Sequence, residues 1–414
     1  MDGGRPFDLA LEAALAGLAD ADRRLAHELA AGTLRAAGVL DTSIAPYVRD
    51  GWERVPPRIR NILRLGAYQL TALDRIPPHA AVATTVSLAR EVAGARTAGF
   101  VNAVLRRVAE EAPRVVPGRA SHPGWLVSRW TARFGPEDAA KLMTWNDTRP
   151  RLVTQAARWS DEEHRAQWHR AEVEFTEAPY SAGLLPSLAT RDSRLATPRV
   201  QELPGYSEGG WFVQDVAQAL VVRYFGIPAG SVVYDAAAAP GGKTLAIGRT
   251  ARAVIAGDLR RDRVKRLREN LTRAGSGREH PIVADASEPP VRPVDAVVLD
   301  APCLGTGVLA RHPEARWRVN EEALGRLVAA SRDLLHSLAP VVRPGGLLCF
   351  STCSLEPEEN EMQIEEFLRD DPRFRREPSR DMPADLLSPS GDLTLLPQRH
   401  QTDGAYAARL RRHA

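Results

Sequence analysis

The sequence predicts three parts: an all-α helical domain, a small α+β segment, and an α/β domain with a doubly wound parallel sheet. Three observations predict this. Apolar residues recur at helical spacing from about residue 7 to 112. A mixed pattern of strands and helices follows. From residue 211 onward, short apolar runs alternate with helical segments, which is typical of a parallel sheet with crossover helices. We place the domains at residues 5–118, 121–205 and 206–414.

The first part contains leucines at mixed three-, four- and seven-residue steps in DLALEAALAGLADADRRLAHELAAGTLRAAG. A second helical stretch begins after Pro56-Pro57, and Pro77-Pro78 ends it. Two further stretches follow, HAAVATTVSLAREV and GFVNAVLRRVAEEA. The pattern predicts a bundle of five or more helices and then a linker at residues 113–124, which is rich in Pro and Gly.

The middle segment predicts helices at GWLVSRWTARFG and PEDAAKLMTWN. Strands are expected at RLVTQAA and VEFTEA, on either side of the helix DEEHRAQWHRA. In the last part, the predicted strands are SVVYD, AVIAGD, PIVAD, VDAVVLD and GLLCFST. The helices between and after them are GGKTLAIGRTA, DRVKRLRENLTRA, NEEALGRLVAASRDLLHSLAPVV and EENEMQIEEFLRD.

Composition limits the class of protein. The 414 residues carry a net charge of +3, a weak argument for nucleic acid, and no apolar run reaches the ~18 residues of a membrane span. The N-terminus is acidic and does not resemble a secretory signal. Three cysteines in a long chain argue against a disulfide framework. We therefore expect a cytoplasmic protein with no membrane contact.

The glycine loop in YDAAAAPGGKT resembles a phosphate clamp but lacks its spacing. A P-loop needs a glycine where this chain has Ala237, whose Cβ disfavours the tight turn. The fingerprint Gly-x-Gly-x-x-Gly is also absent, since Gly241 and Gly242 are adjacent. The loop is therefore expected to bind neither a triphosphate nor a dinucleotide.

Four of the predicted strands end in, or just before, an aspartate: Asp235, Asp258, Asp285 and Asp300. One such residue is usually a turn former or helix cap. Four at the ligand-binding edge of a parallel sheet favour a ligand with a cation and vicinal hydroxyls. Asp258 is placed where a ribose-binding carboxylate belongs. A nucleoside without a phosphate clamp indicates S-adenosylmethionine, whose sulfonium favours nearby carboxylates.

Two cysteines are expected on the same rim of the sheet, Cys303 in LDAPCLGTG and Cys353 in STCS. Neither has Cys or His partners at zinc-ligand spacing, so no metal is expected. Cys349, inside the apolar run LLCF, is interpreted as a buried structural residue.

A cysteine beside a methyl donor suits methylation of a pyrimidine at carbon 5. A thiolate that adds to carbon 6 makes carbon 5 nucleophilic, and loss of the carbon 5 proton then expels the thiolate. The base must be unstacked to reach the site. Adenine N6 methylation is the nearest competing chemistry. Those enzymes usually place an aromatic residue in the loop after the fourth strand, which here reads Asp300-Ala301-Pro302-Cys303.

Three segments, DAAAAPGGKT, LDAPCLGTGVLARHPEARW and STCSLEPEENE, resemble the signature segments of RNA cytosine-5 methyltransferases. The segments DRRLAHELAAGTLRAAGVLD, LDRIPPHAAVATTVSLAREVAGARTAGFVNAVLRRVA and GYSEGGWFVQDVAQALV resemble the RsmB (Sun/Fmu) type. That type methylates 16S ribosomal RNA and has an N-terminal NusB-like domain. The resemblance covers nearly the whole chain. It implies a Rossmann-like class I methyltransferase domain, S-adenosylmethionine as cofactor, small-subunit ribosomal RNA as partner, and a monomer.

The resemblance also implies residue roles. The donor's methionine part would lie along the glycine loop, at Ala237, Ala238, Ala239, Pro240, Gly241, Gly242 and Lys243. Asp258 would bind the ribose hydroxyls and Asp285 would lie near the adenine. Asp300 would lie near the sulfonium and the target base.

On the catalytic side, the resemblance implies that Cys353 is the nucleophile and that Cys303 assists breakdown of the covalent intermediate. Arg311 and Trp317 would shape the substrate side. Two alternatives stay open at this point. One is an RNA-binding scaffold with an inactive methyltransferase domain, and the other is a methyltransferase that acts on another RNA or another base.

Overall fold

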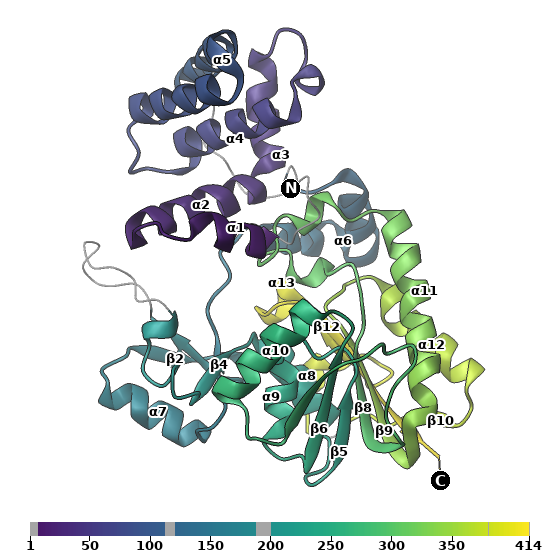
Figure 1. The fold of residues 1–414 in the computed structure, drawn as a ribbon. Helices are drawn as coiled ribbons and strands as arrows, with labels where there is room; N and C mark the ends of the chain where they lie inside the picture. The colour runs from purple at the N-terminus through teal and green to yellow at the C-terminus, as the bar shows by residue number, and fades with distance from the viewer. Residues whose placement is uncertain (1–6, 112–120, 188–199, 380, 414) are drawn as a thin grey trace. The chain divides into compact units, whose positions relative to one another are not determined.

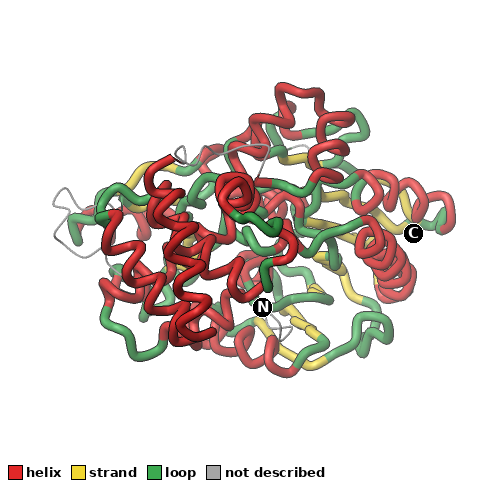
Figure 2. Tube along the Cα trace, turned by 90° about the horizontal axis from the view of Figure 1, so that it is seen from above, coloured by secondary structure: helices red, strands yellow, loops and turns green. Residues whose placement is uncertain are grey.

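A computed structural model of the chain describes residues 7–111, 121–187, 200–379 and 381–413. Figure 1 shows its elements. The chain divides into two compact units. The first comprises Met1–Arg149 with Leu309–Arg318, and the second comprises Pro150–Val308 with Val319–Ala414. All strands of the described residues, yellow in Figure 2, belong to the second unit.

The first unit is helical, as the sequence predicts. Its helices are α1 (Phe7–Leu15), α2 (Asp20–Arg35), α3 (Ala37–Ile44), α4 (Pro57–Ala72), α5 (Pro78–Glu111) and α6 (Gly124–Asn146). The apolar faces of α3, α4 and α5 meet in one core, in which Leu40, Leu63 and Leu105 have no exposed surface. The two predicted pairs of shorter helices lie within α5 and α6, and each pair is divided by a glycine with non-helical backbone, Gly94 with φ of 83° and Gly135 with φ of 81°.

The unit boundaries differ from the predicted domain boundaries at two places. Helix α6 groups with the helical unit, although the pattern assigns it to residues 121–205. The main chain at its end, at Asn146, accepts a hydrogen bond from the buried Arg316 of the same unit. Strand β4 (Trp211–Val213) pairs with β1 (Thr154–Ala156), so it extends the small sheet beyond residue 205. The predicted boundary at 118 and the linker residues 113–120 lie outside the described residues.

The second unit begins with a small antiparallel sheet in the order β2-β3-β1-β4. Its other strands are β2 (Phe175–Glu177) and β3 (Leu184–Pro186), and helix α7 (Asp161–Arg170) joins β1 to β2. Ser160 and Glu163 form a capping box that begins this helix. The two predicted strands are confirmed. β3 and β4 are three-residue strands too short to show a period of their own.

The large sheet has the order β10-β12-β9-β8-β5-β6-β7, with β11 paired to β12. Its strands are β5 (Val232–Asp235), β6 (Ala253–Asp258), β7 (Glu279–Val283), β8 (Val294–Asp300), β9 (Val342–Thr352), β10 (Phe374–Arg376), β11 (Leu393–Leu395) and β12 (Ala405–Arg412). Strands β7, β6, β5, β8 and β9 lie side by side in this order and run parallel to one another. Strand β12 is antiparallel to β9. The doubly wound parallel sheet of the prediction is therefore confirmed, with an antiparallel edge added at the C-terminus.

Helices cover both faces of this sheet. They are α8 (Val216–Phe225), α9 (Gly242–Gly248), α10 (Arg261–Ala274), α11 (Glu321–Leu338) and α12 (Glu361–Asp370), and a short helix α13 (Pro397–His400) precedes β12. Neighbouring strand residues point to opposite faces, so Val298 packs with α8 while Val297 and Leu299 pack with α11 and α12. Among the described residues, no helix is long and apolar enough to cross a membrane.

Candidate active site

The structure brings the two predicted cysteines together. Strands β8 and β9 are paired so that Asp300 lies opposite Ser351, and each strand is followed within three residues by a cysteine. Both thiols are half-buried, and the Sγ atoms of Cys303 and Cys353 lie 3.4 Å apart. The hydrogen bond with Cys353, together with burial, raises the pKa of the Cys303 thiol well above its usual range. Cys303 therefore keeps its proton and can donate it toward the Cys353 sulfur.

A glycine contact holds the two cysteine loops against each other. The N–H of Gly307 donates to the Cys353 carbonyl at 2.9 Å, and the N–H of Gly404 donates to the Gly307 carbonyl at 2.8 Å. A Cβ atom on Gly307 would lie 2.7 Å from the backbone of Gly404 and 2.8 Å from the Cys353 oxygen. Only glycine leaves room for this approach, which explains Gly307 and Gly404 together.

Glu359 stabilises the loop that carries Cys303. Its carboxylate accepts the N–H of Leu304 at 2.9 Å, directly after Cys303, and the side chain is buried. Burial raises the pKa of Glu359 to about 7. Sequence reasoning did not select Glu359. The sequence feature that could have indicated it is the acidic run EPEENE after STCS, but acidic residues are also common in the first turn of any helix.

Asp300 is the charged centre of the site. Its carboxylate accepts Lys243 Nζ at 2.8 Å and the hydroxyl of Ser351 at 2.9 Å. Lys243 also donates to Gln218 of helix α8. The predicted residues Lys243 and Asp300 are therefore in direct contact, and 38% of the Asp300 side chain stays exposed for a ligand.

The glycine loop links β5 to α9 at the same rim. Gly241 lies at the N-cap of α9 in the left-handed region, with φ of 112°. The carbonyl of Ala239 accepts a hydrogen bond from Arg263, and the N–H of Ala238 donates to Gly257 on β6. These contacts fix the backbone of the predicted segment from Ala237 to Lys243 close to the end of β6.

Asp258 ends strand β6 with an unsatisfied oxygen. One carboxylate oxygen accepts the N–H of Arg260 at 3.1 Å. The other lies 3.4 Å from Arg263 Nε but makes no hydrogen bond with the described residues, although the side chain is only 4% exposed. A buried acceptor in this state suits a ligand hydroxyl. The residues present therefore fit the ribose of an adenosyl ligand.

Asp285 and Asp235 have different environments. Asp285 lies two residues beyond β7, is exposed, and accepts both the N–H and the hydroxyl of Ser287, which lowers its pKa. Asp235 is buried under the loop and accepts the hydroxyl of Thr244 at 2.6 Å. Burial raises the pKa of Asp235 to about 6. Asp285 remains a candidate adenine contact, whereas Asp235 anchors helix α9.

The segment Leu309–Arg318 directly follows the loop of Cys303 but belongs to the helical unit. Trp317 donates its indole N–H to the Leu34 carbonyl at 3.1 Å and is 38% exposed. Its neighbour Arg316 is fully buried and lies 2.7 Å from Asp147. Sequence reasoning selected Arg311 and Trp317 but not Arg316, because an arginine among other charged residues is usually exposed to solvent. The substrate-side roles of Arg311 and Trp317 remain predictions.

No group of His, Cys, Asp and Glu residues that could hold a metal ion occurs in the part of the chain that the structure describes. The arrangement combines a thiol pair, a lysine-bound aspartate and a carboxylate with one oxygen that lacks a hydrogen bond among the described residues, at the carboxyl ends of β5, β6, β8 and β9. Such a site can present a sulfur nucleophile beside a bound nucleoside.

Two family models match most of the chain. Residues 227–411 match the family described as 16S rRNA methyltransferase RsmB/F. Residues 2–110 match the NusB family. Ribosomal RNA small subunit methyltransferase B of Vibrio cholerae is 33% identical, with 99% of this chain and 94% of that protein covered. The protein of the same name from Pseudomonas syringae pv. tomato is 32% identical, with 94% and 89% covered.

Two solved structures are similar along much of the chain. The crystal structure of PH0851 is 25% identical, with a TM-score of 0.76, and the match covers 94% of this chain and 90% of that one. The crystal structure of NSun6 from Pyrococcus horikoshii with SFG is 20% identical, with a TM-score of 0.61. That match covers 70% of this chain and 98% of the other, and it shows a shared fold.

Proposed function

The chain belongs to the RsmB/F family of 16S ribosomal RNA methyltransferases, and from this premise we propose that Cys353 is its nucleophile and Cys303 the partner that releases it. As a family member, the protein is an S-adenosylmethionine-dependent rRNA cytosine-5 methyltransferase. The observation that carries the proposed roles is the 3.4 Å separation of the two sulfur atoms.

In the proposed reaction, the Cys353 thiolate forms a bond to carbon 6 of a cytosine, and the electron pair moves toward carbon 5. Bound S-adenosylmethionine supplies the methyl group that carbon 5 takes. The carbon 5 proton then passes to solvent, the ring double bond re-forms, and the carbon–sulfur bond breaks. The S–H of Cys303 stabilises the departing sulfur by a hydrogen bond, because its raised pKa keeps that proton in place.

The remaining predicted residues are assigned to binding. The glycine loop, Ala237 to Lys243, and Asp258 would hold the donor. The buried Asp258 oxygen that has no hydrogen bond among the described residues supports a ribose contact. Asp285 would contact the adenine at its exposed position. Asp300, fixed by Lys243 and Ser351, would orient the target base beside Cys353. We assign RNA contacts to the helical unit and to the small sheet, and propose that the protein acts as a cytoplasmic monomer on small-subunit rRNA.

Covalent trapping tests the thiol roles. With RNA that carries 5-fluorocytosine and with S-adenosylmethionine, the wild type should form an adduct that survives a denaturing gel, whereas Cys353→Ala should form none. Cys303→Ala should accumulate an adduct even on unmodified RNA. An adduct in Cys353→Ala, or prompt release in Cys303→Ala, would contradict the assigned roles. Cys349→Ala is the matched control, since that thiol is buried inside strand β9.

A further inference from the structure

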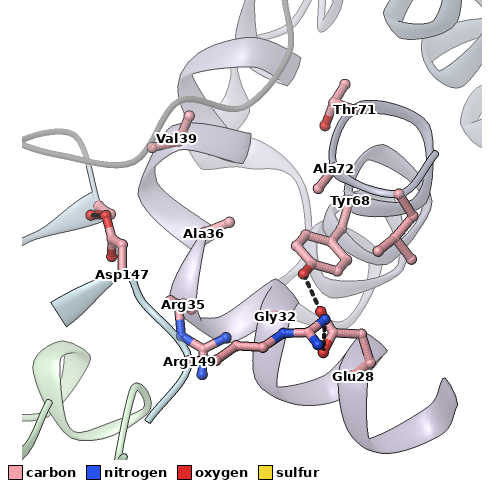
Figure 3. Close-up of a pocket in the computed structure, with 12 residues that line it drawn as sticks. Glu28, Gly32, Arg35, Ala36, Val39, Tyr68, Thr71, Ala72, Asp147 and Arg149 are labelled. Carbon is pink, nitrogen blue, oxygen red and sulfur yellow. Dashed lines mark hydrogen bonds and ion pairs between the residues drawn. The ribbon is translucent and has the colours of Figure 1, made fainter. Parts of the chain in front are cut away.

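A pocket of about 280 Å³ lies within the helical unit, and none of the residues assigned a role above lines it. Helices α2, α3 and α4 and the chain on either side of α6 form its walls. In Figure 3, Arg35, Arg149 and Glu28 lie together at one end of the pocket, while Val39 and Thr71 lie at the other. The pocket therefore has a charged end and a more apolar end.

Most charged groups of the pocket are already committed to partners. Glu28 accepts the Tyr68 hydroxyl at 2.7 Å and lies 2.7 Å from Arg149. Although burial alone raises the pKa of Glu28, the hydrogen bond from Tyr68 and the charge of Arg149 lower it below its usual range. Asp147 is paired with the buried Arg316 at 2.7 Å. Neither carboxylate is left to neutralise a second arginine by direct contact.

Arg35 is the exception. Its guanidinium makes no hydrogen bond and no ion pair with the residues that the structure describes, and its Nε is buried without a partner. Burial lowers the pKa of Arg35, although Tyr68 and the charges of Glu28 and Asp147 act in the opposite direction. A desolvated cation without a bound acceptor costs stability, so a pocket that retains one favours an anionic ligand.

We propose that this pocket binds one nucleotide of RNA, with its phosphate on the guanidinium of Arg35 and its base or sugar against Val39, Ala72 and Leu73. Guanidinium is well suited to phosphate because it offers several N–H donors in one plane. The volume is near the lower end of ligand pockets and suits a single nucleotide rather than a duplex. The choice of RNA over a free nucleotide rests on the proposed function, because RNA is the substrate there.

Fluorescence anisotropy with the full chain and a labelled single-stranded oligoribonucleotide tests the site without the methyl donor. Arg35→Gln should weaken RNA binding about tenfold. It should also reduce the slope of log affinity against log salt by about 0.7, the value for one phosphate contact on a single strand. Arg90→Gln is the matched control, because it removes one exposed arginine of the same unit outside the pocket. Equal affinities of the two variants would overturn the proposal.

A second variant and a second ligand make the test independent of folding. Val39→Phe fills the apolar end and keeps Arg35, and it should weaken RNA binding without lowering the melting temperature. Adenosine 5′-monophosphate is titrated in a thermal-shift assay. If it stabilises the wild type but not Arg35→Gln, while both bind RNA equally, the ligand is a free nucleotide and the RNA assignment is wrong. Cys353→Ala should bind RNA with the affinity of the wild type, because its pocket is unchanged. The binding assay therefore tests the pocket even if the roles proposed for the two cysteines are wrong.

Discussion

The sulfur atoms of Cys303 and Cys353 lie 3.4 Å apart although 50 residues separate them. The parallel pairing of β8 with β9 starts the two loops side by side, and the backbone contact of Gly307 with Cys353 and Gly404 keeps them together. The distance between the thiols is therefore set by main-chain packing around one glycine. It does not depend on the cysteine side chains alone.

Gly307→Ala should reduce methyl transfer to 16S rRNA by about a hundredfold, because a displacement of about 1 Å at a reacting group costs that much. The added Cβ would lie within 2.8 Å of the Cys353 carbonyl oxygen and must push the loop aside. Incorporation of labelled methyl groups into RNA measures the effect.

Gly325→Ala is the control for that variant. Gly325 lies in helix α11, and a Cβ there meets no atom within 4 Å. Alanine in a helix interior should leave activity unchanged and stabilise the fold by about 0.5–1 kcal/mol. Activity of Gly307→Ala equal to that of Gly325→Ala would show that the loop contact does not set the thiol geometry.

Glu359 should make stability depend on pH. Burial raises its pKa to about 7 in the folded protein, whereas the ordinary value is 4.5. The folded state then binds this proton more tightly than the unfolded chain. The contribution is fully present below about pH 4.5 and is lost as pH rises through about 7, which amounts to about 3 kcal/mol.

Glu359→Gln removes this titration while an oxygen remains for the Leu304 N–H. The free energy of unfolding of the variant, relative to the wild type, should therefore increase as pH rises across the same window. Urea unfolding at a series of pH values measures the difference. A constant difference would mean that Glu359 titrates near its ordinary value in the folded protein.

The strand pattern and the aspartates made the large sheet and its ligand edge predictable. Each apolar run that precedes Asp258 or Asp300 is a strand that ends at that residue. Continuous apolar runs are the expected signature of parallel strands buried on both faces, so the signal was strong. The C-terminal edge strands β10 to β12 were harder to predict from the sequence. Strands β10 and β12 contain several arginines, so they do not form continuous apolar runs.

The contacts that complete the site could not be predicted, because they join residues distant in sequence. The pairing of Gly307 with Gly404 depends on the close approach of two loops, and no local pattern encodes it. The burial of Arg316 was hidden for the same reason, since its acceptors lie in α2, before α6 and at the end of α6. The order of the two thiols also required the family resemblance, because both follow strand ends in similar loops.

Asp258→Asn should weaken binding of S-adenosylmethionine about tenfold or more, since the amide offers one acceptor in place of a charged pair of oxygens. The variant can still accept the N–H of Arg260, so the turn after β6 should persist. Isothermal titration calorimetry measures the affinity. Asp262→Asn is the matched control, because that carboxylate is exposed and paired with Arg260. Equal donor affinity in the two variants would remove Asp258 from the binding site.

Arg316 should be among the residues on which the helical unit most depends. It has no exposed surface, and its guanidinium lies 2.7 Å from Asp147 and donates to the carbonyls of Ser121 and Asn146. Removal of one partner from a buried ion pair leaves the other charge uncompensated, which typically costs about 3–5 kcal/mol. Arg316→Met should therefore destabilise the protein by about that amount.

The double variant Arg316→Met/Asp147→Asn separates the ion pair from its surroundings. It should be less destabilised than the sum of the two single variants, because the second change removes the charge that the first one strands. Thermal unfolding of all four proteins gives the coupling energy. Additive losses would mean that Arg316 stabilises the unit through its carbonyl hydrogen bonds and packing and not through the ion pair with Asp147. Since residues 309–318 directly follow the loop of Cys303, Arg316→Met should also lower kcat while the affinity for S-adenosylmethionine stays unchanged, provided the variant is assayed below its melting temperature.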